Sequence, residues 1–347
     1  MTSPAPSKRP SSAPMAESDA ILHPRSRADF LGVDGLEAEL AQALNAGALA
    51  NGWLIVGGEG AGKATLAYRL ARALLWNERP AGSASLDTPA DSRTFALTAS
   101  GGHPDLFVAE RRYDEKKERY ATEISVEVIR DLTHFLSHTA SMGGWRVAII
   151  DSADDLNRNS ANALLKALEE PPSRTAVFVL TATPGRLLAT IRSRCRRIDL
   201  RPLADEAVAG FLAKEGAATG ADALKIARAA GGRPGYALSL ALGDGADAIG
   251  ALEEFWTAVH AGRDVSALAQ KLAGRDAEGV FAYFQAMLSA RLAADAKQLA
   301  KSGDARARAL VILRENIDTL LARGEAVNLD RAQMLTAAAR AFQAAVR

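Results

Sequence analysis

The sequence predicts an α/β domain with a parallel sheet, followed by helical regions over the rest of the chain. From about residue 23 to 202, short apolar segments alternate with amphipathic helical segments, a pattern typical of parallel strands covered by helices on both faces. A glycine-rich turn directly follows the first apolar segment, and such turns bind phosphate groups in α/β proteins. After Pro202 the strand signals end, and helical sequence rich in Ala, Leu and Arg continues.

Four apolar segments have the length expected of buried strands. They are residues 53–56, 105–108, 147–150 and 176–180. Helices are expected over 65–75 and 161–168, where leucines recur at helical spacing, and a Pro-Pro pair ends the second helix. Residues 77–102 are small, polar and rich in helix breakers, so we expect a long loop there.

Composition divides the chain into four expected regions. Residues 1–22 are rich in Ser, Pro and Ala and lack the apolar stretch of a secretory signal, so we expect a disordered tail. The α/β domain covers 23–202. A small helical domain follows over 203–245 and ends in a turn-rich segment, and residues 246–347 form a separate all-helical domain.

The overall composition excludes several classes of protein. The 347 residues are 48% hydrophobic and 24% charged, as in ordinary globular proteins. A formal net charge of +1 provides no general attraction to nucleic acid or anionic lipid, so such contacts require a local patch. Cys195 is the single cysteine, which excludes disulfides within the chain and a cysteine-based zinc site. No apolar run is long enough for a bilayer, and we expect a cytoplasmic protein without a membrane partner.

The glycine-rich turn matches most of a nucleotide-binding phosphate loop. It runs from Gly57 to Gly62 and Lys63, and in the complete motif the lysine is followed by a Ser or Thr whose hydroxyl ligates magnesium. Here that position is Ala64, and Thr65 is turned by about 100° along the helix, so it does not replace the missing hydroxyl. We therefore expect a vestigial phosphate site, weak or empty.

The strand ending at Asp151 supports the same expectation. Asp151 stands where an acidic residue would hold the water shell of magnesium, and Gly57, Gly62, Lys63 and Thr65 complete the vestigial site. The next residue is Ser152, which cannot act as a general base at neutral pH as a carboxylate can. Asp154 and Asp155 follow, and we interpret them as acids at a helix N-terminus.

Four arginines lie within six residues, at 192, 194, 196 and 197. The cluster alone is compatible with a solvated charge run, an anion-binding patch or a contact to phosphate, because a planar and permanently charged guanidinium suits phosphoryl oxygens. Cys195, between them, is expected to be a small buried apolar residue.

Five short segments carry a resemblance to a known family. They are GGEGAGKAT at 57–65, HPD at 103–105, ISVEVIR at 124–130, SANALLKALEEPP at 160–172 and SRC at 193–195. In this order they resemble the bacterial clamp-loader subunits of the AAA+ superfamily, over about residues 23 to 245. The altered phosphate loop and the missing glutamate resemble the type of subunit that has lost its own catalysis.

The resemblance implies an AAA+ P-loop domain, a helical lid over 203–245 and a C-terminal collar domain over 246–347. It implies that Arg194 reaches, in trans, the ATP-Mg of a neighbouring subunit, while this chain needs no cofactor of its own. The implied partners are ATPase subunits of the gamma/tau type and a delta-type subunit within the DNA polymerase III holoenzyme. The sliding clamp and primed DNA would be reached through them.

Three departures from the family accompany the resemblance. Residues 77–102 contain no cysteine, so the zinc module of many relatives is absent. Gly235 stands where active relatives have a lid arginine, with Arg233 two residues earlier, and Thr181 lies near a sensor position.

Two alternatives remain open. One is an active ATPase in which Thr65 and Asp154 replace the lost groups. The other is a stand-alone nucleic-acid-binding protein that uses the four clustered arginines.

Overall fold

A computed structural model describes residues 23–32, 35–47, 49–116, 118–326 and 329–346. The expected disordered tail over 1–22 lies outside these residues. The chain divides between Leu203 and Ala204 into two compact units, which are described separately below.

The first unit contains a five-stranded parallel sheet. Its strands are β1 (Gly52–Val56), β2 (Leu106–Ala109), β5 (Arg146–Ile150), β6 (Thr175–Thr181) and β7 (Arg196–Asp199). Their spatial order is β2-β5-β6-β1-β7, and every neighbouring pair is parallel. A separate hairpin pairs β3 (Tyr113–Asp114) with β4 (Arg119–Tyr120). The predicted α/β class with a parallel sheet is confirmed.

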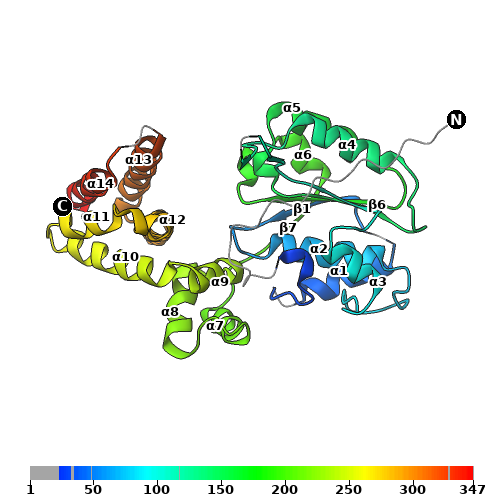
Figure 1. Cartoon of the computed structure of the whole chain (residues 1–347), viewed down its shortest axis with the longest axis horizontal. Helices are drawn as coiled ribbons and strands as arrows, with labels where there is room; N and C mark the ends of the chain where they lie inside the picture. The colour runs from blue at the N-terminus through cyan, green and yellow to red at the C-terminus, as the bar shows by residue number, and fades with distance from the viewer. Residues whose placement is uncertain (1–22, 33–34, 48, 117, 327–328, 347) are drawn as a thin grey trace. The chain divides into compact units, whose positions relative to one another are not determined.

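Helices cover both faces of this sheet (Figure 1). One face carries α1 (Leu36–Asn45), α2 (Lys63–Leu75) and α3 (Arg93–Ala99), and the other carries α4 (Val126–Ser137), α5 (Arg158–Glu169) and α6 (Ala189–Arg194). Side chains of a strand alternate between the faces. Accordingly, Trp53 and Ile55 belong to the core under α1 and α2, whereas Leu54 and Val56 belong to the core under α4, α5 and α6.

Strand β7 and helix α3 are among the elements of the first unit that the sequence did not predict. Strand β7 was not expected, because Arg196 and Arg197 are exposed and only Ile198 of its four residues is buried. As a polar edge strand, β7 lacks the apolar run that identified the other strands. The expected loop over 77–102 contains α3, whose N-terminus is capped by the Ser92 hydroxyl and which buries Phe95.

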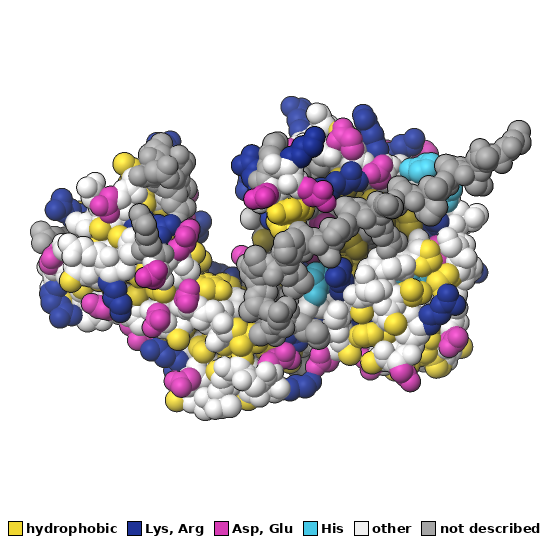
Figure 2. Space-filling view, in the orientation of Figure 1, with side chains coloured by type: hydrophobic (Ala, Val, Ile, Leu, Met, Phe, Trp, Pro, Cys, Tyr) yellow, Lys and Arg dark blue, Asp and Glu magenta, His cyan; other side chains and the backbone are white. Residues whose placement is uncertain are grey.

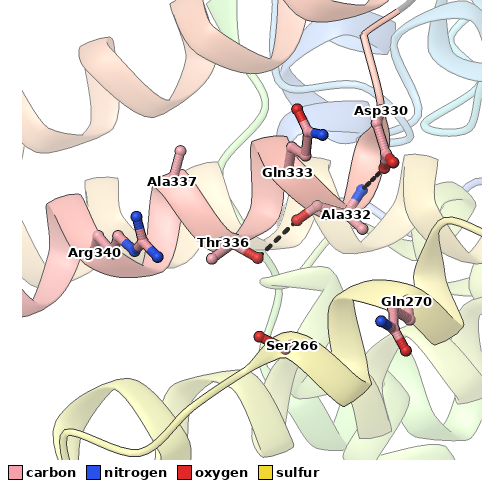
Figure 3. A pocket seen from close by; sticks show the side chains of 8 residues that line it. All are labelled: Ser266, Gln270, Asp330, Ala332, Gln333, Thr336, Ala337 and Arg340. Carbon is pink, nitrogen blue, oxygen red and sulfur yellow. Dashed lines mark hydrogen bonds between the residues drawn. The ribbon is translucent and has the colours of Figure 1, made fainter.

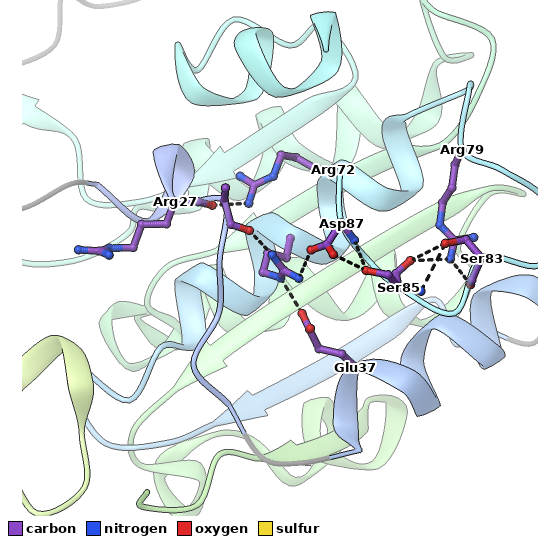
Figure 4. A network of polar contacts seen from close by, with 9 residues as sticks. Arg27, Glu37, Arg72, Arg79, Ser83, Ser85 and Asp87 are labelled. Carbon is purple, nitrogen blue, oxygen red and sulfur yellow. Dashed lines mark hydrogen bonds and ion pairs between the residues drawn. The ribbon is translucent and has the colours of Figure 1, made fainter. Parts of the chain in front are cut away.

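Arg69 and Arg72 of α2 bind the segment that precedes α1. Figure 4 shows Arg72 in this network. Arg72 donates to the carbonyl oxygens of Arg25 (2.9 Å) and Arg27 (2.6 Å), and its guanidinium lies 4.7 Å from the ring centroid of Phe95. Burial, followed by the nearby charge of Arg69, lowers the pKa of Arg72 to about 10. Residues 25–27 are therefore held against α2 by charge-assisted hydrogen bonds.

Arg69 extends this network. It donates to the carbonyl oxygen of Ala28 and forms ion pairs with Glu37 (2.6 Å) and Asp87 (2.7 Å). The carboxylate of Asp87 also accepts from the hydroxyl of Ser85 at 2.7 Å. Residues from the expected loop and from the start of α1 thus converge on one buried face of α2.

The described residues of the second unit form helices and the connections between them, without a strand. Its helices are α7 (Asp205–Lys214), α8 (Gly220–Ala230), α9 (Pro234–Leu242), α10 (Gly245–His260), α11 (Ser266–Leu272), α12 (Glu278–Lys301), α13 (Arg306–Ala326) and α14 (Arg331–Val346). Aromatic side chains, including Phe255, Phe281 and Phe342, are almost fully buried between them. The expected boundary between lid and collar, after residue 245, falls at the start of α10 and stays a prediction.

A polar groove of about 620 Å³ lies between α11 and α14 (Figure 3). Asp330 accepts from the backbone N–H of Ala332 at 2.7 Å, and the Thr336 hydroxyl donates to the Ala332 carbonyl at 2.8 Å. These two hydrogen bonds stay within α14 and the residue that precedes it. They stabilise the helix and do not converge on the groove.

The described part of the chain contains no helix with both the length and the apolar character required to cross a bilayer.

Candidate functional site

The glycine-rich loop joins the carboxyl end of β1 to the first turn of α2. Gly62 has a φ of 93° and precedes α2, and Gly60 has a φ of 71°, values that side chains with a Cβ rarely adopt. A Cβ on Gly62 would also lie 3.1 Å from the ring of Phe30, and one on Gly57 would lie 3.2 Å from Leu200. Gly60 and Gly62 therefore suit the backbone angles of the loop, and a Cβ on Gly57 or Gly62 would make an unusually tight contact.

Lys63 turns back over this loop. Its ammonium nitrogen donates to the carbonyl oxygens of Gly57 (2.8 Å) and Gly58 (3.0 Å). Ala64 contributes no oxygen, and Thr65 is half-buried in the first turn of α2. The loop retains its lysine and its glycines. Ala64, at the position that would supply a magnesium-binding hydroxyl, has only a methyl side chain.

Two acids lie at the carboxyl ends of β2 and β5. Ala109 and Ile150 are paired in the sheet, so the residues that follow them, Glu110 and Asp151, are neighbours. Burial is the main reason that the pKa of Asp151 is raised, and Lys63 opposes this shift. Burial and then the charge of Asp151 raise the pKa of Glu110. A divalent cation would favour both ionised carboxylates, but it would have to bind without the usual hydroxyl ligand.

Ser152 and Asp154 form a hydrogen-bonded link between β5 and β6. The Ser152 hydroxyl donates to Asp154 at 2.9 Å, and Asp154 also accepts from the Thr181 hydroxyl (2.7 Å) and from the backbone N–H of Ala182 (2.6 Å). Burial opposes ionisation of Asp154, but hydrogen bonds from Thr183, Ala182, Thr181 and Ser152 outweigh it and lower the pKa to about 2.

This link changes the interpretation of Asp154 as a helix N-terminal acid. Asp154 and Asp155 do lie in a short 3₁₀ helix, η2 (Ala153–Asp155), yet the side chain of Asp154 is bound to the end of β6. Asp155 differs, because its carboxylate forms an ion pair with Arg111 at 3.3 Å.

Arg194 ends α6 and is about one-third exposed. Its guanidinium forms an ion pair with Glu169 at 2.8 Å and donates to the carbonyl of Thr190 at 3.0 Å. Glu169, at the end of α5, was not singled out from the sequence, although it belongs to the LEEPP segment.

Cys195 is half-buried, against the expectation of a buried residue, and burial raises the pKa of its thiol to about 11.

The other arginines of the cluster contact their own chain. Arg192 donates to the Pro184 carbonyl at 3.2 Å, and Arg197 pairs with Asp199 at 2.7 Å. Arg196 lies over the ring of Trp53, 5.3 Å from its centroid. Basic and acidic side chains are interspersed on the face of the first unit shown in Figure 2.

Arg233, near the expected lid position, precedes α9. It donates to the Ala230 carbonyl at 2.8 Å and lies 4.3 Å from the ring centroid of Tyr236. Gly235 lies in the first turn of α9. Among the residues that the structure covers, there is no group of three or more His, Cys, Asp or Glu side chains arranged to hold a metal ion.

A glycine-rich loop with its lysine, set between the first strand of a parallel sheet and the following helix, defines the first unit as a P-loop domain. The family described as "DNA polymerase III, delta subunit" matches residues 34–204. These residues, just under half of the chain, are similar to that family, and the relatives that the chain resembles include delta-prime subunits.

Three relatives illustrate the similarity. DNA polymerase III subunit delta' of Pseudomonas aeruginosa is 40% identical over 146 residues, which cover 42% of this chain and 42% of that protein. The delta' subunit of Escherichia coli is 37% identical over 185 residues, which cover 53% and 52%. Subunit tau of Escherichia coli is 32% identical over 180 residues, which cover 52% and 26%. The matches thus span about half or less of these relatives.

Proposed function

We propose that this chain is a delta-prime-type subunit of a DNA polymerase III clamp loader. In this proposal it hydrolyses no ATP itself and donates Arg194 in trans to ATP bound by a neighbouring subunit. Its similarity to DNA polymerase III subunits delta' and tau supports the assignment.

Both halves of the hydrolytic site lack a group that catalysis needs. Ala64 provides no magnesium ligand, and Ser152 stands where a carboxylate would orient water. Magnesium coordination and positioning of water are both needed for efficient phosphoryl transfer, so two losses weaken binding and hydrolysis together. Asp154 does not substitute as a base, because its oxygens accept hydrogen bonds from Ser152, Thr181 and Ala182.

Arg194 keeps part of its hydrogen-bonding capacity available for a partner. A guanidinium carries five N–H groups in a planar fork, and Glu169 and Thr190 engage one terminal nitrogen each. The ion pair with Glu169 is partly exposed, so it contributes about 1 kcal/mol or less. The phosphate of a neighbouring nucleotide can displace Glu169 at little cost. An accessible arginine in a chain whose own hydrolytic site lacks a magnesium-binding hydroxyl and a catalytic carboxylate is the observation that carries the proposal.

The partners follow from the same proposal. Gamma/tau-type subunits would bind ATP-Mg and receive Arg194, and a delta-type subunit would complete the loader. The sliding clamp and primed DNA would be reached through the assembled complex, and residues 246–347 would join a collar of equivalent domains. Stand-alone nucleic-acid binding is disfavoured, because Arg192, Arg196 and Arg197 contact groups of their own chain.

The test is the ATP turnover of a loader reconstituted with variants of this chain. Arg194→Ala should reduce turnover by about 10²-fold or more, since an arginine supplied in trans is worth roughly 10³–10⁵ in related GTPases. Arg197→Ala is the matched control, because it removes an exposed arginine from the same cluster and should change turnover by less than about twofold. Wild-type turnover with Arg194→Ala, in a complex of normal stoichiometry, would refute the role of the arginine.

A further inference from the structure

Asp154 is a hydrogen-bond centre at the carboxyl ends of β5 and β6. One carboxylate oxygen accepts from the hydroxyls of Thr181 and Thr183 and from the Thr183 N–H (3.2 Å). The other accepts from the Ala182 N–H and the Ser152 hydroxyl. Every one of these partners donates, so only the ionised carboxylate satisfies them all.

The donors belong to the segment that leads to Arg194. Residues 181–183 lead from the last residue of β6 to the 3₁₀ helix η3 (Pro184–Arg186), and Thr183 is the N-cap residue of η3. The carbonyl of Pro184 then accepts from Arg192 of α6 at 3.2 Å. A continuous series of polar contacts therefore runs from Asp154 through this connection to the helix that ends at Arg194.

Apolar packing secures α6 in a different way. Leu187 and Ile191 are buried in the core under α4 and α5. Apolar burial is non-directional, so it holds α6 against the sheet but selects its orientation only weakly. Hydrogen bonds depend steeply on angle, and those to Asp154 define the path of the chain that enters α6.

We propose that Asp154 is a positioning residue for Arg194: by binding residues 181–183 it sets the orientation in which α6 presents the guanidinium to a neighbouring nucleotide. The inference rests on the proposed function of Arg194. In this arrangement Ser152, in place of a glutamate, provides a hydroxyl that donates to Asp154. Groups near the former hydrolytic site thus support the arginine that acts on a neighbouring site.

Asp154→Asn tests the inference in the reconstituted loader. The substitution replaces one acceptor oxygen by an NH₂ group that faces N–H or O–H donors, so the connection between β6 and η3 has to shift. A misplacement of about 1 Å can cost about 10²-fold in rate. We expect kcat for ATP to fall by about tenfold or more, while KM stays within about twofold, because the nucleotide is bound by the neighbour.

Two further variants separate positioning from folding. Asp155→Asn is the matched control, since it removes a neighbouring acid that pairs with Arg111, and it should leave kcat within about twofold. Thr183→Val removes one hydroxyl donor and keeps the carboxylate, so a smaller fall in kcat is expected. If Asp154→Asn does not assemble, Thr183→Val decides: reduced kcat in an intact complex supports the inference, and wild-type kcat overturns it.

A double-mutant cycle gives the final criterion. If Asp154 acts through Arg194, then Asp154→Asn should not reduce turnover further in the Arg194→Ala background. An independent, multiplicative loss would overturn the inference, as would wild-type kcat for Asp154→Asn alone. Failure of the proposed function is distinguishable, because it appears as wild-type turnover of Arg194→Ala by itself.

Discussion

Restoring the glutamate that the site lacks should destabilise this protein. In Ser152→Glu a carboxylate replaces a hydroxyl that donates to Asp154 at 2.9 Å. The substitution removes a donor and places a second negative charge beside Asp154, and Asp151 is the preceding residue. Asp154 is ionised at neutral pH because its pKa is about 2, so the repulsion is present under ordinary conditions.

The magnitude follows from Coulomb's law. Two unit charges about 4 Å apart interact by about 4 kcal/mol at an effective dielectric constant of about 20. Solvent near the half-buried Ser152 reduces the repulsion, and the longer side chain can turn partly away. We therefore expect the free energy of unfolding to fall by about 2 kcal/mol at neutral pH, relative to Ser152→Gln, which has a similar shape and no charge.

The assay is denaturant unfolding of both variants between about pH 4 and pH 8. Repulsion raises the pKa of the new carboxyl in the folded state above its unfolded value of about 4.3. A raised folded pKa means that the folded state binds more protons, so stability falls as pH rises. The difference between the two variants should be small near pH 4 and reach its full value above the raised pKa. Equal stability at pH 8 would refute the reasoning about Asp154.

Three further predictions concern other parts of the first unit. Arg72→Met should lower the free energy of unfolding by about 2 kcal/mol in denaturant titrations, because the half-buried carbonyls of Arg25 and Arg27 lose their donors; unchanged stability would contradict this. Cys195 should react much more slowly with a chromogenic thiol reagent at pH 8 in the folded than in the unfolded chain, because its thiol pKa is about 11, and equal rates would contradict its burial. Lys63→Ala should leave the turnover of the reconstituted loader within about twofold, since its ammonium binds its own loop; a large loss would mean that the loop holds nucleotide.

Local patterns in the sequence determined most of the strands and the position of the phosphate loop. Apolar runs and glycine clusters span only a few consecutive residues, so they can be recognised without knowledge of the fold. The SRC tripeptide likewise identified Arg194 as the arginine of interest among four. Where the pattern was weak, as in the polar edge strand β7 and the short helix α3, the prediction failed.

Tertiary structure alone decided which polar groups meet. Asp154 binds Thr181, Ala182 and Thr183, which lie 27–29 residues further along the chain, and nothing in helical or strand periodicity predicts these contacts. Pairing of Arg194 with Glu169 depends in the same way on the packing of α5 beside α6. Hydrogen bonds and ion pairs between distant segments depend on how the sheet and helices assemble. The burial pattern of each helix or strand, by contrast, follows from the spacing of its own apolar residues.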